Sequence, residues 1–167
     1  MSIIKKIILT LSVIFLCCLN QASAEEIKKI GKYKDWEAMV VTSDAGKICF
    51  AQSLPILQGP KSNNKRDAKL FVSFWPSEKT INEISVTAGY KFNNSNSVTA
   101  ISGKNKFKFD IKEQGFAWIA DNKVEFRMIS KMKKGSRIMI TGYNQKNSQT
   151  IDHYSLLGFT KAYNATK

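Results

Sequence analysis

The chain has 167 residues and a net charge of +13, with 26 Lys and Arg against 13 Asp and Glu. This length is typical of one domain with a sizeable core. The basic balance favours acidic partners, namely nucleic acid, lipid headgroups, lipopolysaccharide or acidic glycans, although a lysine-rich surface can also serve solubility alone. A single histidine and, past the N-terminal segment, a single cysteine exclude a tetrahedral zinc site within one chain, and we expect no cofactor.

Residues 1–24 have the pattern of a signal peptide. Two lysines precede an apolar run that ends at Leu19, and a small-x-small sequence ends at Ala24. We therefore expect cleavage between Ala24 and Glu25, with a retained membrane anchor as the alternative. Export makes nucleic acid the least expected of the acidic partners.

Cys49 is the only cysteine outside this segment, so we expect no internal disulfide in the exported domain. The residue is either a small buried apolar side chain or a thiol for an intermolecular bond.

The rest of the chain shows short alternating runs bounded by turn residues. Residues 25–34 are charged, and we expect a flexible lead-in before a single domain over residues 35–167. The runs predict antiparallel strands at residues 35–42, 48–54, 68–75, 83–92, 98–101, 106–111 and 116–119. In the run 106–111, alternation places Phe107, Phe109 and Ile111 inward.

Residues 55–67 form the longest stretch without periodicity. The stretch holds two prolines and a basic cluster of Lys61, Lys65 and Arg66. A loop of this length on a compact domain is either functional or disordered.

An amphipathic helix is predicted from Asn122, which acts as N-cap with Glu125 completing a capping box. Its apolar face consists of Val124, Met128, Ile129 and Met132. Gly135 is expected to end the helix in the left-handed conformation.

Two further strands, residues 138–141 and 151–157, flank a polar turn and predict a hairpin, and residues 160–167 predict a short closing helix. In the second strand Asp152, Tyr154 and Leu156 share one face, opposite to His153. About nine short strands with regular turns indicate a mainly β protein, an antiparallel sandwich or barrel. The helices should cover an edge or an open end.

Four segments carry a resemblance to a known family by their order: GKYKDWE, ISVTAGY, MISKMKKGSRI and YSLLGFTKA. Over nearly all of the predicted domain the chain resembles the invasion-associated locus B family of exported Gram-negative proteins. The resemblance implies an immunoglobulin-like antiparallel β-sandwich with one amphipathic helix and a short C-terminal helix. It also implies an exported protein, in the periplasm or at the outer membrane, that is linked in some pathogens to host-cell entry. No enzymatic activity is established for the family. Family members often pair a second cysteine with the one at Cys49, and this chain has none in the strand of Met39 and Val41, which argues against a disulfide-dependent role.

We expect a binding domain whose basic face contacts an acidic protein, lipid or glycan of the envelope or host, with peripheral membrane association. The sequence does not predict the number of subunits. The candidate residues are Lys61, Lys65, Arg66, Lys104, Lys106, Lys108 and Lys112. The alternatives are a structural or chaperone-like module that uses an edge strand and, less favoured, an envelope hydrolase. The lysines of residues 106–111 could equally protect an edge strand from aggregation.

Trp75 and Trp118 are candidates to line a ligand groove, with core packing as the alternative. His153 has Asp152 and Ser155 as neighbours, but Asp152 points to the other face and Ser155 lies about 7 Å along the strand. We therefore expect no catalytic residues and no metal ligands.

Overall fold

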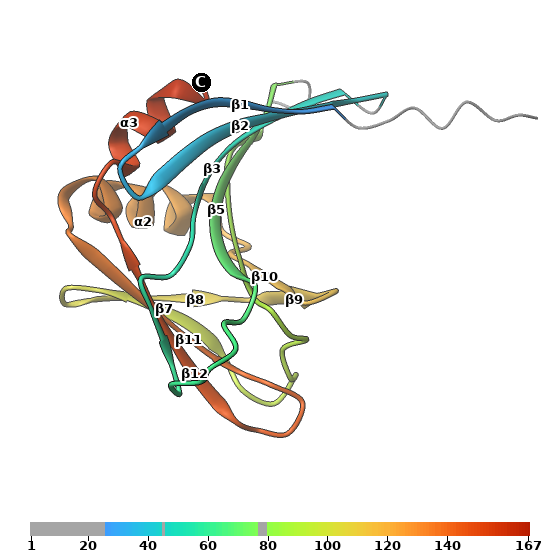
Figure 1. Ribbon diagram of the computed structural model, residues 1–167, viewed down its shortest axis with the longest axis vertical. Coiled ribbons are helices and arrows are strands. Elements are labelled where there is room, and N and C mark those ends of the chain that lie inside the picture. Colours follow the sequence, from blue (N-terminus) through green and yellow to red (C-terminus); the bar gives the residue numbers. More distant parts are fainter. Residues whose placement is uncertain (1–25, 45, 77–79) are drawn as a thin grey trace, which may run out of the picture.

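The structure is a computed structural model that describes residues 26–44, 46–76 and 80–167. The expected signal peptide and its cleavage between Ala24 and Glu25 lie outside these residues. Two antiparallel sheets form a sandwich with two helices beside them (Figure 1). The predicted fold class is confirmed.

The seven-stranded sheet contains, in spatial order, β1 (Glu26–Tyr33), β2 (Trp36–Ser43), β3 (Gly46–Ser53), β5 (Ala68–Trp75), β6 (Thr80–Ala88), β10 (Phe116–Trp118) and β9 (Ile111–Glu113). The five-stranded sheet contains β4 (Leu57–Gly59), β12 (Gln149–Ser155), β11 (Arg137–Tyr143), β7 (Val98–Ser102) and β8 (Asn105–Phe109). The helices are α2 (Asn122–Lys134) and α3 (Phe159–Ala165). Both predicted hairpins, β2–β3 and β11–β12, are present.

The core lies between the inner faces of the two sheets, as period-two alternation dictates. Trp36 is fully buried, its ring centroid lies 4.8 Å from that of Phe159, and its indole N–H donates to the carbonyl of Ser155 at 2.8 Å. Cys49 is a buried free thiol, so its apolar interpretation is confirmed. The contacts of Trp36 join the start of β2 to the C-terminal part of the chain.

The helices close one side of the sandwich, as expected for an open end. In Figure 1, α3 lies beside the end of the larger sheet where β1 turns into β2, and α2 lies between these strands and β8. α3 contacts β1, β2 and β3, whereas α2 contacts β6, β8 and α3. The buried side of α2 includes Met128, Ile129 and Met132, as its periodicity predicted.

The expectation of a flexible lead-in at residues 25–34 is wrong. Its described part forms β1, which pairs with β2 from Glu26 opposite Thr42 to Tyr33 opposite Trp36. β1 is an edge strand with exposed side chains, so its lysines stay in water while its backbone hydrogen-bonds to β2. The strand was not predicted because its side chains are charged and exposed and show no alternation of apolar and polar residues.

The inward placement of Ile111 is also wrong, although Phe107 and Phe109 are buried as predicted. β8 ends at Phe109, and the chain crosses at Asp110 into the other sheet, where β9 begins. Because the alternation restarts in a different sheet, Ile111 points outward and is 47% exposed.

The ends of α2 differ in detail from the prediction. Asp121 is the N-cap and accepts a hydrogen bond from the N–H of Lys123 at 2.7 Å. Glu125 forms no capping box; it is buried and accepts from the N–H of Ile84 at 2.7 Å. Gly135 is extended, with φ −89°, rather than left-handed. A Cβ there would lie 3.0 Å from the Leu156 side chain, so close packing rather than backbone conformation favours glycine.

Glu125 makes the stability of the fold depend on pH. Burial raises its pKa from 4.5 to about 7, against the opposing hydrogen bond from Ile84. The folded chain thus holds this proton more tightly than the unfolded chain. The resulting stabilisation is complete below about pH 4.5 and is lost as the pH rises through about 7, with a total on the order of 3 kcal/mol.

We therefore expect Glu125→Gln to remove this dependence, since the amide oxygen still accepts from Ile84 and carries no charge. The measurement is the urea midpoint of both proteins between pH 4 and pH 8, taken as a difference so that the other acids cancel. Parallel curves for the two proteins would contradict a protonated buried Glu125.

Candidate functional site

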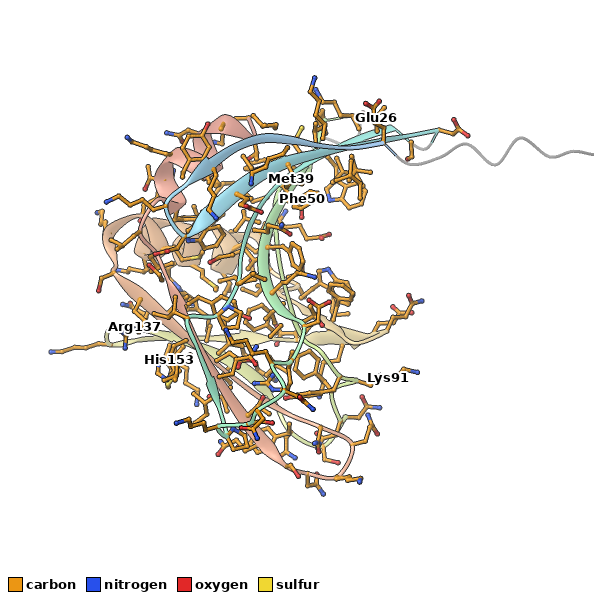
Figure 2. All side chains as sticks on the ribbon, viewed as in Figure 1. Glu26, Met39, Phe50, Lys91, Arg137 and His153 are labelled. Atoms are coloured by element: carbon orange, nitrogen blue, oxygen red, sulfur yellow. The ribbon has the colours of Figure 1, made fainter. Side chains whose placement is uncertain are left out.

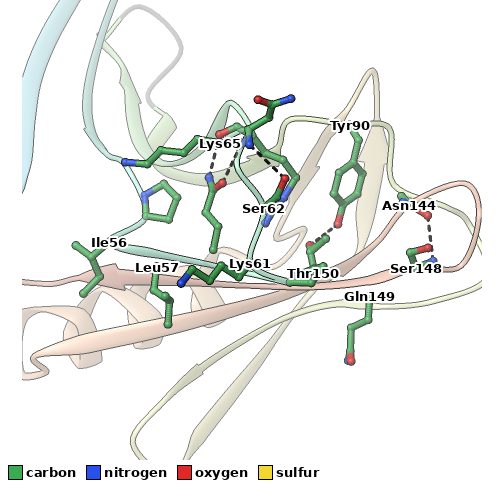
Figure 3. A pocket seen from close by; sticks show the side chains of 15 residues that line it. Ile56, Leu57, Lys61, Ser62, Lys65, Tyr90, Asn144, Ser148, Gln149 and Thr150 are labelled. Carbon is green, nitrogen blue, oxygen red and sulfur yellow. Dashed lines mark hydrogen bonds between the residues drawn. The ribbon is translucent and has the colours of Figure 1, made fainter.

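A cavity of about 440 Å³ lies where the loop of residues 55–67 meets Tyr90 and the β11–β12 turn (Figure 3). We call it the loop pocket. Ile56, Leu57 and the Tyr90 ring supply apolar lining, and Gln149 and Thr150 supply polar lining. Its volume lies within the range of ordinary small-ligand sites. Two members of the basic cluster, Lys61 and Lys65, stand beside it.

The loop that builds the pocket is ordered by hydrogen bonds. Its short strand β4 pairs with β12, and the Ile56 N–H donates to the carbonyl of His153 at 2.8 Å. The Gln58 amide accepts from the Arg66 N–H at 2.8 Å and donates to the Arg66 carbonyl at 2.9 Å. These hydrogen bonds give residues 55–67 a defined conformation.

Arg66 fastens the base of the pocket to the core. Its guanidinium donates to both carboxylate oxygens of Asp152, at 2.5 and 3.0 Å, and to the carbonyl of Ala88 at 2.7 Å. It also lies over the Tyr90 ring, 5.7 Å from the centroid. Asp152 is only 2% exposed. Arg66 is therefore a structural residue whose charge is neutralised internally, and its assignment as a ligand-binding cation is not supported by these contacts.

Burial changes the pKa values of the polar groups beneath the pocket. It raises the pKa of Asp152, while the hydrogen bonds from Arg66 act in the opposite direction. Burial likewise raises the pKa of Tyr90, whose hydroxyl lies 2.6 Å from that of Thr150. The Tyr154 hydroxyl is buried without a hydrogen-bond partner among the described residues. A buried polar group in this state lowers the stability of the fold.

Lys61 and Lys65 are the free cations of the pocket. Both side chains are exposed, and neither forms an ion pair with a described residue. The residues that line the pocket include no Asp or Glu. With Arg66 neutralised by Asp152, the lysines give the pocket a net positive charge over a partly apolar wall.

The other predicted basic residues do not join this site. β4 and β8 are opposite edges of the five-stranded sheet, so Lys106 and Lys108 lie about 19 Å from β4 at the usual strand spacing. Lys108 lies 3.7 Å from Asp110. The Lys112 ammonium donates to the carbonyls of Asn93, Asn94 and Asn96, which makes it structural. Lys104 is exposed in the β7–β8 turn, on the same side as β8.

Neither Trp75 nor Trp118, the two candidates for lining a ligand groove, lines the loop pocket; they belong to β5 and β10 of the seven-stranded sheet. Trp118 instead contacts Phe116, with ring centroids 5.7 Å apart. The contacts continue from Phe116 to Phe71 at 6.2 Å and from Phe71 to Phe50 at 6.0 Å. The sequence did not predict this row of phenylalanines, because alternation within one strand does not show which strands are neighbours in the sheet.

Figure 2 places Phe50 on this sheet and His153 on the other sheet. His153 is half-buried, and its Nδ1 has no described hydrogen-bond partner. Asp152 points into the core toward Arg66, and the Ser155 hydroxyl accepts from the N–H of Leu157 at 3.2 Å. These three side chains do not assemble a nucleophile and base. Within the described ranges, no group of His, Cys, Asp and Glu could hold a metal ion.

A family model described as invasion associated locus B (IalB) protein matches residues 36–167. The chain belongs to the IalB family. The crystal structure of invasion associated protein B from Bartonella henselae is similar in fold, with 15% sequence identity and a TM-score of 0.53. The match covers 85% of this chain and 94% of that chain. No match is found among curated proteins.

The resemblance read from the sequence motifs is thus confirmed, and the matched residues 36–167 include both helices and every described strand except β1. IalB membership associates the chain with the bacterial envelope and invasion. Neither described helix is long and apolar enough to cross a membrane.

Proposed function

We propose that this IalB-family protein is a non-catalytic binding domain of the cell envelope that holds an acidic group of its partner through Lys61 and Lys65. The supporting observation is the charge of the loop pocket. Its two exposed ammonium groups face no acidic lining residue, and its third cation is neutralised by Asp152 from below. An anion placed there gains two favourable interactions and meets no carboxylate.

The internal ion pair explains why the pocket can hold a shape without a ligand. Arg66 joins the loop to β12 through Asp152 and to β6 through the Ala88 carbonyl. Gln58 holds the same residue by its backbone. The lysines therefore project from a fixed loop, which lowers the entropy cost of binding.

An acidic lipid, lipopolysaccharide or acidic glycan of the envelope or host surface fits this chemistry. The alternative of an edge-strand module draws no support from β8, since Lys106 and Lys108 project from it as charges that deter strand pairing. A hydrolase draws no support from His153, because its neighbours Asp152 and Ser155 are engaged elsewhere.

Reversal of both pocket lysines, Lys61→Glu with Lys65→Glu, is expected to weaken binding to lipopolysaccharide or to vesicles containing phosphatidylglycerol by about thirtyfold or more. A lysine near an anionic membrane surface contributes about 1 kcal/mol, and reversal adds repulsion. Binding of the unaltered protein should fall steeply with salt, as the Debye length drops from about 10 Å at 0.1 M to about 3 Å at 1 M. Co-sedimentation across this salt range provides the measurement.

Two reversals of equal charge serve as controls. Lys106→Glu with Lys108→Glu alters the β8 edge, and Lys123→Glu with Lys131→Glu alters the exposed side of α2. Each should cost much less affinity than the loop-pocket reversal. An equal loss in all three proteins would show attraction by net charge alone and would exclude a binding site at the loop pocket.

A further inference from the structure

A second cavity, of about 530 Å³, lies where the β1–β2 turn meets the C-terminal end of α2 and the segment that leads into α3. Four lysines line it, Lys32, Lys34, Lys133 and Lys161, and no acidic residue does. We call it the lysine pocket; it shares no lining residue with the loop pocket. We propose that the lysine pocket binds a diphosphate or a pair of adjacent phosphate groups.

The frame of the lysine pocket is fixed by backbone contacts. The Asp35 N–H donates to the carbonyl of Leu157 at 3.3 Å, and the Leu156 N–H donates to that of Ser136 at 3.0 Å. These two bonds join the β1–β2 turn and the end of α2 to one segment, residues 156–158. The cavity is therefore a built junction of three parts of the chain rather than a dent in a mobile surface.

The lysines reach this junction from separate places in the sequence. Lys34 lies in the tight turn with a left-handed backbone, φ 54°, which a non-glycine residue adopts at a cost. Lys133 is in the last turn of α2, and its ammonium lies 4.2 Å from the centroid of the Tyr163 ring. Lys161 is in the first turn of α3. Convergence of like charges from three elements is unfavourable unless an anion offsets it.

Acidic groups do lie nearby, and they account for one lysine only. Glu37 is 3.9 Å from Lys32, but it lies closer to Lys29, at 2.5 Å. Asp35 and Glu37 line the adjoining cavity rather than this one. Lys34, Lys133 and Lys161 form no ion pair with a described residue. The pocket thus keeps a charge of about three to four units.

This charge selects among anions. A single carboxylate would neutralise one lysine and leave the others repelling one another. A phosphate group carries a charge of about −1.5 to −2, so two of them supply about −3 to −4, which matches the pocket. Lysine binds phosphate as a point charge, whereas the planar fork of arginine that suits carboxylates is absent from the lining.

Two sources could supply such phosphates: a soluble diphosphate or a phospholipid headgroup. Leu157 lines the same pocket and is 51% exposed, so an apolar side chain stands beside the cations. Lysines next to an exposed leucine suit the boundary between headgroups and acyl chains. The two sources are separated by the choice of probe.

The test measures binding of inorganic pyrophosphate by calorimetry, and of phosphatidylcholine vesicles doped with phosphatidic acid by co-sedimentation. The test protein carries Lys34→Asn and Lys161→Gln, because asparagine tolerates the left-handed backbone at residue 34. We expect a loss of affinity of about tenfold for at least one probe, since each exposed ion pair contributes up to about 1 kcal/mol. Pyrophosphate binding alone identifies a soluble ligand, and vesicle binding alone identifies a headgroup.

The matched control removes two charges from the same end of the molecule, by Lys131→Gln with Lys134→Gln, at exposed α2 residues outside the pocket. It should bind both probes nearly as well as the unaltered protein. The variant Lys61→Gln with Lys65→Gln should also retain pyrophosphate binding, because these residues line the other pocket. The test of the lysine pocket is therefore independent of the loop-pocket proposal. Equal losses in the test and control proteins, or no binding of either probe at low salt, would overturn the proposal.

A second measurement needs no variant. Lysine acylation of the unaltered protein, followed by mass spectrometry, should slow at Lys34, Lys133 and Lys161 when the probe that binds, pyrophosphate or the phosphatidic acid vesicles, is added. Lys131 and Lys134 should react at unchanged rates. Uniform protection of all five lysines would contradict a specific phosphate site.

Discussion

Arg66→Ala is expected to lower the free energy of unfolding by about 3–5 kcal/mol, because it leaves the Asp152 carboxylate buried without its cation. Asp152 is 2% exposed and accepts two hydrogen bonds from this guanidinium. The same change removes the donor to the Ala88 carbonyl. Chemical denaturation at neutral pH measures the loss.

Companion variants separate the charge from the shape of the side chain. Arg66→Lys keeps the charge but loses the two-pronged contact, and it should fall between the parent and Arg66→Ala. The double change Arg66→Met with Asp152→Leu should recover much of the loss, since a buried ion pair gains little over apolar packing. Lys106→Ala, at an exposed site, should change stability by no more than about 0.5 kcal/mol. An Arg66→Ala protein as stable as the Lys106→Ala protein would contradict the buried pair.

Gly158→Ala is expected to destabilise the fold by about 2–6 kcal/mol. Gly158 has φ +93°, where a Cβ is strained by about 1–3 kcal/mol. An added Cβ would also lie only 1.8 Å from the carbonyl oxygen of Tyr33, and overpacking of this kind costs about a further 1–3 kcal/mol. The β1–β2 turn must move away from α3 to accommodate it.

Gly103→Ala is the matched control for this prediction. Gly103 also has a left-handed backbone, φ +59°, but no atom lies within 4 Å of its added Cβ. It should incur only the conformational cost of about 1–2 kcal/mol. Thermal midpoints of the two variants therefore isolate the contribution of the close approach to Tyr33. Equal shifts would show that the turn and α3 do not pack tightly.

Local patterns were sufficient to predict most elements of this fold. Alternation over residues 68–75 predicted a strand there, which is β5, and its Leu70, Val72 and Phe74 are buried. The 3.6-residue period predicted α2 and its buried methionines. Periodicity predicts these elements well because each has a single face buried against the core.

The errors arose where an element lacks that simple environment. β1 is an edge strand whose exposed lysines show no alternation, and Ile111 follows a change of sheet within two residues. Gly135 was assigned a left-handed backbone from its position alone, whereas the Leu156 side chain determines the need for a glycine. Periodicity carries no information on which sheet a strand joins.

The candidate site was predicted in part. Lys61 and Lys65 of the non-periodic loop do line one cavity, but Lys106 and Lys108, which were grouped with them, lie at the opposite edge of the sheet, and only the strand order shows this. Arg66 and Asp152 are 86 residues apart, and no local rule pairs them. The one available signal was that Asp152 shares a face with Tyr154 and Leu156, which places a carboxylate in the core and calls for a buried partner.

The contact between Trp36 and the Ser155 carbonyl spans 119 residues, so the first buried side chain of the domain meets its partner only when the chain is nearly complete. During synthesis, β2 and β3 can pair as soon as both emerge, yet Phe159 and Tyr163 are still missing from the core. A contact between residues so far apart in the sequence forms late, because the intervening chain must close first. A nascent chain that lacks the last ten residues presents an uncovered tryptophan, which is the state that holdase chaperones and proteases recognise.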